Sequence, residues 1–94
     1  MTVVWSPRAI EHLTHLRSYI AGDNPKAANR IAGTLLDAVE RLAELPNLGR
    51  PGRVAGTREL VVPGTPYVIA YRLRSDRIEV IAVFHSRQKW PRRL

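Results

Sequence analysis

The sequence predicts an α+β fold, in which an N-terminal strand and a two-helix hairpin pack on an antiparallel sheet of about four strands. Two stretches with apolar residues at helical spacing fill most of the first half of the chain. Three runs rich in β-branched or alternating apolar residues follow a connection rich in proline and glycine. The part after this connection is too short to fold alone, so we expect a single domain over residues 1–94.

The N-terminal strand is expected at residues 3–5, directly before the helix-start signal Ser6-Pro7. Serine caps the free N–H groups at a helix start, and proline fits the first helical position because no N–H is needed there. Apolar residues then recur at helical spacing as far as about Ile20, and Gly22 is expected to end this helix.

The second helix is expected to start at Asn24-Pro25, which repeats the pairing of a capping residue with a proline. Its apolar residues step by three and four, and further apolar residues widen the stripe beyond the narrow seam of a coiled coil. The pattern therefore favours packing against the first helix and a sheet over a dimerisation zipper. The helix should end at Leu45, because the residue before Pro46 resists helical geometry.

The second half of the chain is expected to form an antiparallel meander of three strands, at residues 60–62, 67–73 and 78–85. Strict alternation along the last two strands gives them apolar side chains on both faces. The side chains expected on the outer face are Val68, Ala70, Ile81 and Val83. Two explanations stay open: a partner protein covers this face, or the strands are buried within the domain itself.

All of the net positive charge lies in the second half of the chain. Residues 1–49 carry five Lys/Arg and five acidic residues, whereas residues 50–94 carry ten Lys/Arg and three acidic residues. Such a one-sided excess makes a directional positive field, which favours a nucleic acid or an acidic protein as the partner. The chain has no cysteine, no apolar run near the ~20 residues of a membrane span and no signal-peptide pattern, so we expect a cytoplasmic protein with no membrane partner.

The basic residues cluster where predicted strands end and turns begin, and arginine side chains suit the oxygens of phosphate groups. Trp90 lies in a polar tail, where an aromatic side chain is better explained as a contact for a partner than as core. The residues expected to bind the target are Arg50, Arg53, Arg72, Arg74, Arg77, Lys89, Trp90, Arg92 and Arg93.

His85 closes the last predicted strand and Arg87 follows two residues later, so an imidazole and a guanidinium are expected near one rim. In RNA cleavage an imidazole acts as acid or base, and arginine stabilises the charge on the phosphorane. A packing or hydrogen-bonding role for His85 stays open. His12 and His15 share a helix flank without a third ligand, and no phosphate-binding glycine loop is present, so no metal or cofactor is expected.

Five segments of the chain, taken in order, resemble the RelE/ParE family of bacterial type II toxin–antitoxin toxins, which includes plasmid stabilisation proteins. They are VVWSPRAIEHL, DNPKAANRI, LPNLGRPGRVAGTREL, TPYVIAYRL and VIAVFHSRQKWP, and they span nearly the whole chain. The resemblance implies a RelE/ParE-like fold and a toxin that inhibits bacterial growth. It also implies a cognate antitoxin, usually acidic and partly disordered, that wraps the sheet and would contact Val68, Ala70, Ile81 and Val83.

The family has two branches with different targets. ParE-like toxins inhibit DNA gyrase, whereas RelE-like toxins cleave messenger RNA in the ribosomal A site. RelE-like toxins commonly carry an arginine at the position of Val68, and the valine together with the PYVIAYR and VFHSRQKWP segments favours the ParE branch. If the chain is RelE-like, the resemblance implies an endoribonuclease with Arg58, His85 and Arg87 as catalytic residues. A basic nucleic-acid-binding module without toxicity is a third interpretation.

Overall fold

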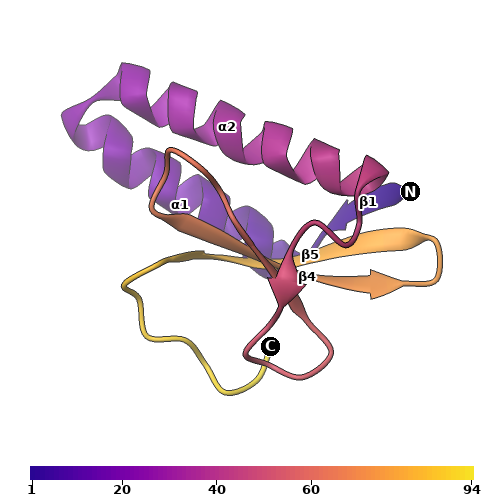
Figure 1. Ribbon diagram of the computed structural model, residues 1–94. Coiled ribbons are helices and arrows are strands. Elements are labelled where there is room, and N and C mark those ends of the chain that lie inside the picture. The colour runs from indigo at the N-terminus through magenta and orange to yellow at the C-terminus, as the bar shows by residue number, and fades with distance from the viewer.

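The α+β prediction is confirmed by the computed structural model, which describes residues 1–94. The two helices lie side by side on one face of a single twisted sheet, here called the helix face, and the opposite face is called the far face (Figure 1). The elements are β1 (Thr2–Trp5), α1 (Pro7–Asp23), α2 (Pro25–Glu44), β2 (Arg50–Pro51), β3 (Arg58–Val61), β4 (Tyr67–Arg74) and β5 (Arg77–His85).

The sheet has five strands in the order β1-β5-β4-β3-β2. The pairs β5–β4, β4–β3 and β3–β2 are antiparallel, as expected for a meander. The N-terminal strand β1 joins the edge parallel to β5, so the sheet is mixed rather than purely antiparallel. The other edge is the two-residue strand β2, which forms within the stretch expected to be a plain connection.

The two helices share one capping residue, Asn24. Its backbone N–H donates to the carbonyl of Ile20 at 2.8 Å, and its side-chain oxygen accepts from the N–H of Ala27 at 3.1 Å. The prediction that Gly22 ends the first helix was wrong, because α1 continues to Asp23. A glycine costs a helix only about 1 kcal/mol, whereas Asn24 precedes a proline and adopts an extended conformation that helical geometry cannot continue.

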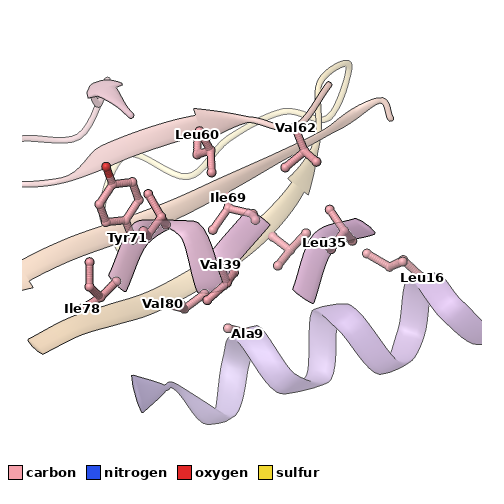
Figure 2. Packing of buried hydrophobic residues seen from close by; sticks show 12 residues of the cluster. Ala9, Leu16, Leu35, Val39, Leu60, Val62, Ile69, Tyr71, Ile78 and Val80 are labelled. Carbon is pink, nitrogen blue, oxygen red and sulfur yellow. The ribbon is translucent and has the colours of Figure 1, made fainter. Parts of the chain in front are cut away.

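The main hydrophobic core lies between the helices and the helix face (Figure 2). Tyr71 of β4 is fully buried there, and its hydroxyl accepts from the N–H of Gly49 at 2.9 Å and donates to the carbonyl of Pro46 at 2.8 Å. A Cβ on Gly49 would lie 2.7 Å from the Tyr71 ring, so only glycine fits at this close approach. Tyr71 therefore fixes the path of the chain from α2 into β2.

A β-bulge changes which face the end of β5 presents. Ala70 lies opposite Ala82, but its neighbour Tyr71 lies opposite Val80, so Ile81 is the additional residue on β5. Val80 and Val83 consequently both join the helix-side core, although strict alternation predicts opposite faces for them. The prediction that Val83 lies on the outer face was wrong for this reason.

The far face is covered in part by the chain's own C-terminal tail, residues 86–94, which returns beneath the sheet on the side away from the helices (Figure 1). The N–H of Ser86 anchors its start by donating to the carbonyl of Pro66 at 2.7 Å. Trp90 and Leu94 then pack against a small buried cluster, here called the far cluster, which consists of Ala70, Ala82 and Phe84. Of the two explanations for the two-sided apolar strands, burial within the domain therefore accounts for this cluster.

Candidate binding site: a cationic face and tail

Strand geometry places three of the predicted arginines on the far face. Tyr71 and Leu73 pack towards the helices, so their neighbours Arg72 and Arg74 point to the opposite side of β4. Arg74 lies opposite Arg77 of β5, and directly opposed residues on paired strands share a face. The β4–β5 hairpin therefore presents a row of guanidinium groups away from the helices.

Glu79 neutralises only part of this row. Arg74 Nε lies 3.5 Å and Arg77 Nη2 lies 3.1 Å from its two carboxylate oxygens. About half of each arginine side chain is exposed, so these ion pairs contribute little to stability, about 0–1 kcal/mol each. Two guanidiniums share one carboxylate, which leaves an excess positive charge at this end of the sheet.

Glu59 of β3 organises a second pair of arginines. Its side chain is 2% exposed. The carboxylate accepts from Arg50 Nη2 at 3.1 Å, from Arg53 Nε at 3.2 Å and from the Arg53 backbone N–H at 2.7 Å. Burial alone would raise the pKa of Glu59, but the hydrogen bonds from Arg53 and Arg50 outweigh it, so the pKa lies below its ordinary value. Glu59 is therefore ionised at neutral pH and holds the loop after β2 against the sheet.

Arg53 connects this loop to the C-terminal tail. Its guanidinium carbon lies 3.9 Å from the centre of the Trp90 ring, which is cation–π geometry, and Trp90 lies 4.3 Å from Phe84 between ring centres. Trp90 was expected to be an exposed contact in a polar tail, but it packs into the far cluster, and its Nε1 is buried without a hydrogen-bond partner. The tail is thus held to the sheet mainly by ring packing.

The remaining far-face and tail cations have no carboxylate partner, because every ion pair in the structure involves Glu59 or Glu79. The tail, which contains the remaining basic residues, runs beneath the sheet on the side away from the helices (Figure 1). We call the combined set the cationic surface: Arg50, Arg53, Arg72, Arg74, Arg77, Arg87, Lys89, Arg92 and Arg93. Two carboxylates shared among these side chains leave a large net positive charge.

The three residues considered as catalytic are not brought together. Arg58 lies opposite Tyr71 and donates from Nη1 to the carbonyl of Gly49 at 2.6 Å. His85 lies opposite Tyr67, four residues away along β4, which corresponds to ~13 Å at strand spacing. The backbone N–H of Arg87, rather than its guanidinium, contacts His85 by donating to Nδ1 at 3.1 Å. The strand positions of Arg58 and His85 therefore separate the phosphate-holding group from the acid–base group that the sequence suggested.

The four apolar residues expected to face a partner differ in accessibility. Val68 and Ala70 lie on the far face but are 3% and 0% exposed. Ile81 is half-buried at the edge of the far cluster. Val83 is packed beneath the helices and cannot be reached from the far face.

The sequence did not predict the structural roles of two polar residues, Glu59 and His12. Glu59 has a weak sequence signal, since it is an acid beside the apolar run that begins at Leu60. His12 accepts the backbone N–H of Val83 on its Nδ1 at 3.1 Å, and its ring lies 5.4 Å from Phe84. Burial, assisted by the charge of Arg8, lowers the pKa of His12, so the neutral ring that this hydrogen bond requires is favoured.

No group of three or more His, Cys, Asp or Glu side chains has the arrangement of a metal site. Neither helix combines the length and the apolar character that a membrane span requires.

Comparisons with known proteins show that the chain is similar to a toxin family and to individual proteins named as toxins. Residues 3–90 match the family described as ParE toxin of type II toxin-antitoxin system, parDE. The putative toxin Y4kP of Sinorhizobium fredii is 45% identical over 87 residues, which cover 93% of this chain and 90% of that protein. The toxin RelE2 of Caulobacter vibrioides is 42% identical over 84 residues, which cover 89% of this chain and 93% of that protein.

A solved structure has the same fold. A chain of the chromosomal ParDE TA system from P. aeruginosa aligns with a TM-score of 0.82 over 90% of this chain and 95% of its own length. The two sequences are 23% identical, so this similarity concerns the arrangement of helices and strands.

Proposed function

The chain belongs to the ParE toxin family of type II toxin–antitoxin systems, and we propose that it arrests bacterial growth by binding and inhibiting DNA gyrase. We further propose that a cognate antitoxin neutralises it by covering the cationic surface. Its proposed place of action is the cytoplasm, where both gyrase and ribosomes are found.

The separation of Arg58 from His85 is the observation that carries the choice of gyrase over RNA cleavage. An RNA-cleaving site needs its acid, base and phosphate-holding groups within hydrogen-bond reach of one phosphate. The strand positions of Arg58 and His85 are ~13 Å apart along β4. A binding inhibitor needs only a surface of complementary charge and shape, which the cationic surface supplies. Ribosome-dependent mRNA cleavage is the alternative, because relatives that are 42% and 33% identical carry the name RelE.

Two assays with the purified toxin distinguish these targets. We expect the toxin to reduce supercoiling of relaxed plasmid by gyrase and to leave messenger RNA intact in a translating ribosome mixture. Codon-positioned cuts in the message with normal supercoiling would reject the gyrase proposal in favour of the nuclease.

A charge-reversal pair tests whether the cationic surface is the binding surface. Arg72→Glu replaces a far-face guanidinium that has no ion-pair partner, whereas Arg30→Glu makes the same change on an exposed position of α2. We expect Arg72→Glu to weaken gyrase inhibition by roughly tenfold or more, because like-charge contacts at an interface are strongly unfavourable. Arg30→Glu should inhibit like the native toxin. Equal inhibition by both variants, each folded by circular dichroism, would place the binding surface elsewhere.

The proposed antitoxin is an acidic, partly disordered protein encoded beside this chain. Each carboxylate on the far face is shared by two arginines, so acidic side chains of a partner would find guanidinium groups with unused hydrogen-bond donors. Ile81, which is half-buried, is proposed as the apolar contact. Val68 and Ala70 lie on the same face but are buried, and Val83 is excluded because it faces the helices. Co-expression of the neighbouring gene should restore growth, and the affinity of the complex should fall steeply with salt. A complex that is insensitive to salt would contradict charge pairing.

A further inference from the structure

A hollow of about 320 Å³ lies between α1, the ends of β4 and β5, and the start of the tail, and none of the roles described above uses it. All three histidines of the chain and two of its three tyrosines line it. The lining residues that carry the argument are His12, His15, Tyr19, Tyr67, His85 and Gln88.

Backbone contacts orient three of these side chains. His12 Nδ1 accepts the N–H of Val83 at 3.1 Å, and His85 Nδ1 accepts the N–H of Arg87 at 3.1 Å. Only an unprotonated ring nitrogen accepts a hydrogen bond, so each neutral imidazole carries its proton on Nε2. Likewise, the Gln88 oxygen accepts the His85 N–H at 3.2 Å, which leaves its NH₂ group free. All three side chains therefore have unused N–H donors.

The other polar groups that line the hollow also supply hydrogen-bond donors, and none of them is a carboxylate. The hydroxyls of Tyr19 and Tyr67 and the ring of His15 form no hydrogen bond within the chain, and no carboxylate lines the hollow. Burial, with a contribution from Tyr19, raises the pKa of Tyr67, so this phenol keeps its proton at neutral pH. The hollow is consequently surrounded by donors from three parts of the chain.

We propose that this hollow binds a phosphate group. A phosphate offers three or more strong acceptor oxygens, which matches a set of imidazole, phenol and amide donors better than the two oxygens of a carboxylate do. Arg87 and Lys89 flank Gln88 in the tail and add positive potential beside the hollow without lining it. Aromatic rings form part of the wall, since Tyr67 and His85 pack edge to face at 5.6 Å between ring centres. A phosphate attached to a nucleoside could stack its base there.

The test is an NMR titration of the full chain with sodium phosphate, compared with sodium acetate and sodium chloride at matched ionic strength. We expect saturable shifts of His15, His85 and Gln88 signals with phosphate and much weaker shifts with acetate. A further titration with a 5′-mononucleotide shows which kind of molecule carries the phosphate group. Tighter binding than inorganic phosphate identifies the ligand as a nucleotide, and equal affinity identifies it as free phosphate. Acetate that saturates the same signals as tightly, or phosphate shifts confined to the arginines, would overturn the proposal.

Two variants at exposed positions of α1 locate the binding groups without disturbing the core. Tyr19→Phe removes one hydroxyl, and His15→Ala removes a ring that has no hydrogen bond within the chain. Loss of a hydrogen bond to a charged ligand should weaken phosphate binding by roughly tenfold in at least one of them. Arg30→Gln, which removes an exposed cation of α2 outside both the hollow and the cationic surface, should change the affinity by about twofold or less through long-range charge. Native affinity in both α1 variants would also overturn the proposal.

Discussion

Replacing Tyr71 by phenylalanine tests how strongly one buried hydroxyl holds the segment that leads into the cationic surface. Phenylalanine keeps the buried ring and its packing, so the change removes only the hydroxyl group with its hydrogen bonds to Gly49 and Pro46. The N–H of Gly49 is buried and would be left without a partner, which costs about 1–3 kcal/mol. Pro46 is half-buried, so water can hydrate its carbonyl, and loss of the hydrogen bond from Tyr71 costs about 1 kcal/mol.

We therefore expect Tyr71→Phe to lower the free energy of unfolding by about 2–4 kcal/mol in urea denaturation at neutral pH. For a domain of this size the melting temperature should fall by roughly 10–30 °C. Tyr67→Phe is the matched control, because the Tyr67 hydroxyl forms no hydrogen bond within the chain, and it should stay within about 0.5 kcal/mol of the native protein. Equal melting of both variants and the native chain would refute the reasoning, because it would show that the Gly49 N–H finds another partner at no cost.

Three further changes test the charge and packing arguments. Glu59→Gln should reduce stability by about 1–3 kcal/mol at neutral pH in urea denaturation. Because the folded pKa of Glu59 is depressed, the stability that its ion pairs contribute is present above the ordinary pKa of 4.5 and is lost as the pH falls through the folded pKa. A stability difference between the native protein and Glu59→Gln that persists unchanged at low pH would contradict the ion pairing. The folded pKa of His12 is lowered from 6.5, so the unfolded chain takes up a proton more readily and the free energy of unfolding should fall as the pH drops from about 7 to 5. The free energy of unfolding of His12→Gln should depend less steeply on pH. An identical pH dependence would show that His12 does not cause the effect. Leu35→Ala should cost about 2–5 kcal/mol because the side chain is fully buried, and an unchanged melting temperature would show that Leu35 is not part of the core.

The cationic surface shows how a small sheet can keep arginines ordered without neutralising them. Glu59 and Glu79 each hold two arginines in place. Each group of one glutamate and two arginines therefore keeps a net positive charge. The buried carboxylate also fixes Arg53, which in turn lies over Trp90 and holds the tail. One acidic residue therefore positions basic groups from a loop and the tail on one face.

Both helices could be predicted from the sequence because their signals are local. A helix start depends on a capping residue and a proline within one turn, as at Ser6-Pro7 and Asn24-Pro25, and an amphipathic stripe depends on spacing within a few turns. The placement of Val68 and Ala70 on the face away from the helices followed from alternation along a single strand. The surplus of arginine after residue 50 likewise identified the half of the chain that carries the cationic surface.

The faces and partners of the later residues were decided by contacts between distant parts of the chain. The bulge at Ile81 arises from how β5 pairs with β4, and a single additional residue moves Val83 from the predicted outer face to the core. Trp90 became part of the far cluster only because the tail returns to Phe84 and meets Arg53 from a separate loop. Alternation and capping depend on residues that are neighbours in sequence. Strand register and the packing of the tail depend instead on the free energy of contacts that exist only in the folded chain. The register of β3, β4 and β5 is also what separates Arg58 from His85.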